Sequence, residues 1–213
     1  MLDKEQKKEF ITLLRSTERD GVEELLEELE DLGFFLAPAS SRFHLNEEGG
    51  LVEHSLNVCR IALGIREQMI ALNADMEPML KKDSVIISAL LHDVCKADIY
   101  KKTVKQRKDR SGKTITTEGW KLDYTNFPLG HGEKSVIVCL RAGLAMSDYE
   151  IMAIRWHMSS WDLPFQSADI KENMNTARNI CPLCAVIQTA DTLATNILER
   201  KSMEQDDEYF YFD

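Results

Sequence analysis

The chain has 213 residues, 44% of them hydrophobic, which is typical of one globular domain with a substantial core. No apolar run approaches the roughly 20 residues of a bilayer-spanning helix, and the charged start MLDKEQKKEF lacks a signal peptide's apolar stretch, so we expect a cytoplasmic protein with no membrane partner. The net charge of −10 disfavours non-specific binding to a long polyanion, and five cysteines without a second C-x-x-C pair argue against a four-thiolate zinc site.

Two segments in the first third of the chain show the three-and-four apolar spacing of amphipathic helices. In the first, this spacing is kept by Val22, Leu25, Leu26, Leu29 and Leu32, and Gly33 ends the helix. After Gly50 a second stripe consists of Leu51, His54, Val58, Ile61 and Ile65. A histidine therefore lies on a face that we expect to pack against the core.

The stretch SALLHDVCKAD, residues 88–98, runs apolar and then places His92 and Asp93 side by side. Alone, this doublet is weak evidence for a site, because buried histidines are commonly held by ordinary hydrogen bonds. Its meaning depends on the other titratable residues of the chain.

Residues 99–126 depart from the helical pattern and predict a β-hairpin. Thr and Val are frequent, DRSG at 109–112 is typical of a turn, and Trp120, Leu122 and Tyr124 alternate as one strand face would. Eight cations lie between Lys101 and Lys121. The hairpin is either a solvated basic arm or part of a substrate mouth.

Two further helices are predicted in the last third. Ser147 and Glu150 have the spacing of a capping box, so a short helix should carry His157 near its end. A longer helix begins near Pro182, and Asp191 stands among its apolar positions, where an unpaired carboxylate would be costly. We expect that helix to bury Leu183, Ile187, Ala190, Ala194 and Leu198. The tail EQDDEYFYFD mixes acidic and aromatic residues, which suggests docking on a surface.

Four of the five histidines and one aspartate recur at intervals that suit one helix and its connection. Successive members of this set are 38, 39, 26 and 34 residues apart: His54, His92, His131, His157 and Asp191. Successive helices of a bundle can thus each deliver one ligand to a shared centre. A divalent metal with imidazole partners would also satisfy Asp93 and Asp191 in apolar surroundings. Such donors suit one or two ions of Mn, Fe, Zn, Ni or Co, with Mg also admissible.

At these residues the sequence resembles the HD-domain metal-dependent phosphohydrolases. His54, the His92-Asp93 doublet and Asp191 match the H…HD…D signature of that family in order, and the resemblance extends over residues 34–200. A bacterial and phage subgroup is matched by longer phrases: FFLAPASSRFHLNEEGGLVEHSLNV, LLHDVCKAD, FPLGHGEKSV, AIRWHM and TADTLAT. The start GGLVEH is also similar to HD domains attached to bacterial 3′–5′ exoribonucleases. One departure is Met158, which stands where many two-metal relatives carry a second adjacent histidine.

Together with the periodicity, the resemblance implies an all-α HD-domain helical bundle with a small β-hairpin insertion. The expected single domain comprises N-terminal helices (1–33), a metal-binding core (34–98 and 127–200), the basic hairpin (99–126) and the tail (201–213). The resemblance implies a first metal on His54, His92, Asp93 and Asp191, with Asp93 bridging to a second metal on His131 and His157. Metal coordination lowers the pKa of water towards about 7, so a metal-activated water would be the nucleophile.

Two charged residues near these ligands are candidates for supporting roles. Lys96 lies one turn beyond Asp93 and could neutralise a phosphate oxygen as a catalytic residue, or be a surface lysine. Glu133 follows His131 by two residues and is a candidate substrate-binding residue; it could also orient a metal ligand or stabilise the start of a helix.

Candidate substrate-binding residues flank the predicted ligands. Arg42 and His44 precede the His54 helix and either contact substrate or pack within a loop. Arg155 and Trp161 flank His157 and could pair with phosphate and stack on a base, while Trp156 is better explained by core packing.

Three functions fit these features. The first is hydrolysis of a phosphoester in a nucleotide or related small phosphorylated substrate, which suits the acidic net charge. The second is a phosphodiesterase or 3′–5′ exonuclease acting on single-stranded or cyclic nucleotides, in which the basic hairpin follows a strand; nucleic acid is the less favoured partner. The third is a non-catalytic, metal-containing nucleotide sensor, since a fold does not guarantee activity.

Overall fold

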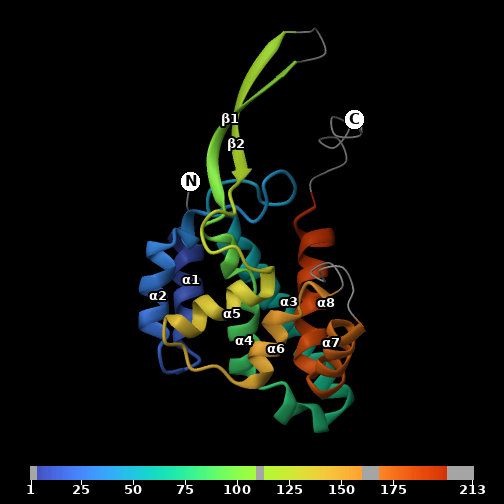
Figure 1. Cartoon of the computed structure of the whole chain (residues 1–213). Helices are drawn as coiled ribbons and strands as arrows, with labels where there is room; N and C mark the ends of the chain where they lie inside the picture. The colour runs from blue at the N-terminus through green and yellow to red at the C-terminus, as the bar shows by residue number, and fades with distance from the viewer. Residues whose placement is uncertain (1–3, 109–112, 160–167, 201–213) are drawn as a thin grey trace.

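The computed structural model describes residues 4–108, 113–159 and 168–200, which form a helical bundle with one protruding hairpin (Figure 1). The longer helices are α1 (Lys4–Arg15), α2 (Val22–Asp31), α3 (Gly50–Leu72), α4 (Lys82–Leu91), α5 (His131–Arg141), α6 (Asp148–Arg155), α7 (Ala168–Ile180) and α8 (Pro182–Leu193). Short 3-10 helices are η1 (Phe34–Leu36), η2 (Ala74–Met79) and η3 (Val94–Lys96). This architecture confirms the expected all-α bundle with a β insertion. Within the described ranges, the helices are too short or too polar to cross a membrane.

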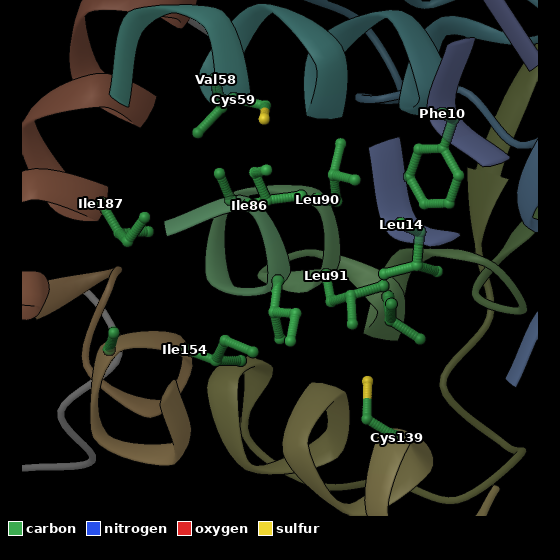
Figure 2. Close-up of a cluster of buried hydrophobic side chains, with 14 of the residues drawn as sticks. Phe10, Leu14, Val58, Cys59, Ile86, Leu90, Leu91, Cys139, Ile154 and Ile187 are labelled. Carbon is green, nitrogen blue, oxygen red and sulfur yellow. The ribbon is translucent and has the colours of Figure 1, made fainter. Parts of the chain in front are cut away.

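Helix α4 forms the centre of the bundle. Every residue from Ser84 to Leu91 is buried, and in Figure 2 the side chains of Ile86, Leu90 and Leu91 point towards several surrounding helices. The labelled neighbours are Phe10 and Leu14 of α1, Val58 and Cys59 of α3, Cys139 of α5, Ile154 of α6 and Ile187 of α8. A helix that is apolar on all sides is stable only in such a position. His92 and Asp93 come directly after its last residue and therefore lie inside the bundle.

The double glycine before His54 sets the start of α3. Gly49 has a φ of 84°, a conformation that favours glycine. A Cβ on Gly50 would lie 2.1 Å from the backbone oxygen of Leu45, so only glycine allows the loop to approach this closely. His54 lies one turn into the helix and is fully buried, as its stripe predicts.

Helix α8 buries Leu183, Ile187, Ala190 and Ala194 as predicted. It continues into a π-helical turn, Ala194–Leu198, and the prediction that Leu198 is buried was wrong. Leu198 is 59% exposed, whereas Glu199 is 9% exposed. A π turn contains an additional residue, so the residues after it are rotated about the helix axis relative to α-helical spacing. Glu199 consequently faces the core in place of the leucine.

The hairpin pairs β1 (Tyr100–Lys108) with β2 (Thr114–Leu122) in antiparallel register and extends away from the helices (Figure 1). Its base is anchored on the loop before α3, because Trp120 Nε1 donates to the backbone oxygen of Asn46 at 2.9 Å and Lys102 pairs with Glu48 at 3.3 Å. The predicted turn at 109–112 and the tail at 201–213 lie outside the described residues. All five cysteines are buried free thiols.

Candidate metal centre

The ends of several helices bring the predicted ligands together in the core. His54 comes from α3, His92 and Asp93 from the end of α4, and Asp191 from α8. The Nε2 atom of His54 lies 3.2 Å from Nε2 of His92 and 3.3 Å from Oδ1 of Asp191. Residues that are 137 positions apart in the chain, His54 and Asp191, are therefore in contact.

Asp93 lies between two groups of partners. Its Oδ2 is 3.5 Å from Nε2 of His54 and 3.3 Å from Nε2 of His92. Its Oδ1 is 2.7 Å from Nε2 of His131, the first residue of α5, and 3.5 Å from Nε2 of His157, which comes shortly after α6. Burial alone would raise the pKa of Asp93. Nearby cations, with Lys96 foremost, have a larger, opposite effect and hold the pKa well below its ordinary value. The carboxylate thus stays ionised and presents one oxygen to each group.

Backbone carbonyls fix the tautomers of two of these histidines. Nδ1 of His92 donates to the oxygen of Ala89 at 2.8 Å, and Nδ1 of His157 donates to the oxygen of Ile154 at 2.7 Å. In the neutral rings, each Nε2 is then an unprotonated acceptor that faces the carboxylates. Nε2 of His157 is buried without a hydrogen-bond partner. The unpartnered Nε2 of His157 and the neighbouring carboxylate oxygens of Asp93 are atoms of the kind that bind a divalent metal, so these residues fit such an ion.

His54 is oriented by Glu199, a residue that the sequence analysis missed. Nδ1 of His54 donates to the Glu199 carboxylate at 3.0 Å, and Nδ2 of Asn57 donates to the same group at 3.0 Å. Burial alone would lower the pKa of His54. Hydrogen bonds to Asp191, Asp93 and Glu199 have a larger, opposite effect, so the pKa lies well above its ordinary value. A carboxylate behind a ligating imidazole fixes the ring so that Nε2 points to the metal.

Replacing Glu199 by glutamine should weaken divalent metal binding by about 10- to 100-fold, because the His54 ring loses its charged acceptor. Competition against a chromophoric chelator measures this affinity. The matched control is Glu47→Gln, at an exposed glutamate in the loop before α3, which should leave affinity unchanged. Equal affinities for both variants and the unmodified protein would contradict the role of Glu199.

Lys96 lies in the centre, whereas Glu133 and Arg155 pair with each other. Nζ of Lys96 is 2.6 Å from Oδ2 of Asp93, one helical turn away as predicted. Glu133 and Arg155 form an ion pair, and the Arg155 guanidinium stacks 4.1 Å above the Trp156 ring. Trp156 is half-buried and lies outside the apolar core of the described residues, so the prediction that it packs in the core was wrong.

The loop before α3 brings His44 to the outer side of His54. Their ring centroids are 5.2 Å apart, and Nε2 of His44 is 3.9 Å from the Glu199 carboxylate. Burial, together with the charge of His54, lowers the pKa of His44 to about 4. Arg42 in the same loop is exposed, and Trp161 lies outside the described residues.

Comparisons with known proteins agree with this geometry. A family model described as HD domain matches residues 51–196, more than half of the chain. The chain is 40% identical over 60 residues to dihydroneopterin 2′,3′-cyclic phosphate phosphodiesterase from Methanocaldococcus jannaschii. This match covers 28% of the chain and only 23% of the relative. No solved structure matches the chain. The family match over the buried His and Asp residues shows that the chain belongs to the HD domain family of metal-dependent phosphohydrolases.

Proposed function

We propose that the chain hydrolyses a phosphoester of a nucleotide, or of a related small phosphorylated substrate, at a centre of one or two divalent transition metals. The observation that carries this proposal is the buried Nε2 of His157, which has no hydrogen-bond partner and lies 3.5 Å from Asp93. A bound ion would use this lone pair, lower the pKa of a coordinated water towards about 7 and neutralise phosphoryl oxygens.

The proposed ligands divide along the two oxygens of Asp93. The first ion would be held by His54, His92, Asp93 and Asp191, and the second by Asp93, His131 and His157. This division is supported by distances of 3.5 Å or less from each imidazole to a carboxylate oxygen of the cluster.

Lys96 is proposed to bind a phosphoryl oxygen. Burial alone would lower the pKa of Lys96. The Asp93 carboxylate has a larger, opposite effect, so the pKa lies above its ordinary value and the ammonium keeps its charge. A fixed positive charge beside a phosphoryl group favours the transition state over the ground state when negative charge increases there. Arg42 and His44, in the loop before α3, and Arg155 and Trp161, near His157, are proposed to contact the remainder of the substrate.

Removal of metal should abolish hydrolysis, and restoring Mn²⁺ should recover it, because among the described residues the centre offers only the single charge of Lys96 in place of a divalent ion. We would incubate chelated and Mn²⁺-loaded protein with nucleotides, cyclic nucleotides and short oligonucleotides, and measure products by chromatography alongside elemental analysis. Full turnover by metal-free protein would overturn the proposal. Tight metal and nucleotide binding without turnover would instead favour the non-catalytic sensor.

A second candidate is a phosphodiesterase acting on single-stranded or cyclic nucleotides. The relative from M. jannaschii is called a phosphodiesterase. The eight cations between Lys101 and Lys121 favour binding of an extended polyanion. Lys101 lies directly opposite Lys121 in the strand register. Like charges in this position destabilise a hairpin unless an anion binds between or beside them.

Reversing both charges, Lys101→Glu with Lys121→Glu, should weaken oligonucleotide binding and flatten its salt dependence. Two lost contacts to single-strand phosphates change the slope of log K against log salt by about 1.4. Fluorescence anisotropy at several salt concentrations measures this. Lys81→Glu with Lys82→Glu, at exposed lysines at the start of α4, is the matched control. Identical slopes for the two double variants would argue against a strand-binding hairpin.

A further inference from the structure

Cys95 lies two residues after Asp93, in η3, and is 2% exposed. Its backbone N–H donates to Oγ of Ser135 at 3.1 Å, and that hydroxyl donates to the backbone oxygen of His131 at 3.3 Å. These two bonds hold η3 against the first turn of α5. The thiol is consequently fixed next to the imidazole of His131, and the potential ligand atoms of Asp93, Cys95 and His131 all lie within 4.8 Å of one another.

The Oδ1 side of Asp93 needs a cation for a reason that does not involve Cys95. Nε2 of His157 points to this oxygen from 3.5 Å and is buried without a hydrogen-bond partner. Asp93, His131 and His157 supply three donor atoms here. A catalytic zinc ion binds a water in addition to its protein donors and can expand to five ligands, so a fourth protein donor still leaves a position for that water. Met158, the residue after His157, offers only a weakly binding thioether. The buried thiol of Cys95 is a strong donor, and its sulfur lies within 4.8 Å of the ligand atoms of Asp93 and His131.

We propose that Cys95 is a thiolate ligand of the second ion, together with Asp93, His131 and His157. The inference rests on the proposed function and adds one donor to its metal centre. On binding, the thiol releases its proton to solvent. Sulfur donors favour zinc and similar borderline ions over magnesium and manganese, which prefer oxygen. The second position therefore selects zinc or cobalt, while the first, with only imidazole and carboxylate donors, accepts a wider range of ions.

The direct test uses the unmodified protein loaded with two zinc ions. X-ray absorption at the zinc edge should show a sulfur shell at about 2.3 Å in addition to a nitrogen and oxygen shell at about 2.0–2.1 Å. Cobalt(II) substitution should produce a thiolate-to-cobalt charge-transfer band in the near ultraviolet. Neither measurement depends on turnover or on the folding of a variant.

Variants then assign the sulfur to a residue. Cys95→Ser should lose both signals and weaken the second zinc by at least about tenfold, with little change in manganese affinity. Cys59→Ser is the control for loss of an equally buried thiol, and Cys184→Ser is the control for zinc bound at the C-x-x-C pair. Both controls should keep the signals, and circular dichroism verifies the fold of each protein.

A two-zinc protein with no sulfur shell would overturn the proposal. So would signals that disappear in Cys184→Ser and persist in Cys95→Ser. If either occurs while chelator-sensitive hydrolysis remains, only the assignment of Cys95 fails. A protein that binds no divalent ion would overturn the proposed function as well.

Discussion

Alanine in place of Asp93 should reduce turnover by about a thousandfold or more. The carboxylate presents one oxygen to His54 and His92 and the other to His131 and His157, so both groups lose their shared partner. Metal-assisted stabilisation of a phosphoryl transition state contributes several kcal/mol, and each 1.36 kcal/mol corresponds to about tenfold in rate. Product formation under saturating Mn²⁺ measures the turnover, and elemental analysis of the same sample measures the bound metal.

Asp98→Asn is the matched control for this variant. Asp98 lies five residues further along and accepts a hydrogen bond from Nζ of Lys134 at 2.6 Å, outside the histidine cluster. It is a half-buried carboxylate in an ion pair, so its loss tests the general cost of removing such a group. Hydrolysis should persist in Asp98→Asn. Turnover retained in Asp93→Ala would refute the assignment of the centre.

The sequence predicted those parts of the centre that depend on local patterns. His54 lies on an apolar stripe, and the doublet comes after the strongly apolar segment that forms the central helix. The capping box at Ser147 and Glu150 is present, and it starts the helix that precedes His157. In each case a short-range rule determines on which face or at which end the side chain lies.

Other parts depend on contacts that no local pattern contains. Glu199 reaches His54 because a π turn rotates the end of α8, and α-helical spacing instead predicted burial of Leu198. No local pattern distinguishes Cys95 from the other four cysteines, and its proximity to His131 arises only when η3 packs on α5. The pairing of Glu133 with Arg155 likewise requires the packing of α5 against α6.

Arg19 is a further long-range case, and its replacement by methionine should lower the free energy of unfolding by about 3–5 kcal/mol. Its guanidinium donates to both carboxylate oxygens of Glu150, at 3.0 and 2.9 Å, and to Asp83 at 2.7 Å. The Glu150 carboxylate is completely buried. Without Arg19 it becomes a buried charge without its cation, which costs far more than loss of a surface pair. Urea unfolding in the presence of chelator measures the change without a contribution from bound metal.

Two companion variants separate the buried carboxylate from simple loss of an arginine. Arg15→Met removes an exposed pair with Glu23 and should cost at most about 1 kcal/mol. Adding Glu150→Gln to Arg19→Met should recover part of the stability, because glutamine keeps the capping box with Ser147 and carries no charge. Arg19→Met could instead lower the free energy of unfolding no more than Arg15→Met does. The Glu150 charge would then be satisfied by other groups, and the contact between the α1–α2 turn and α6 would not be what holds the helix before His157 in place.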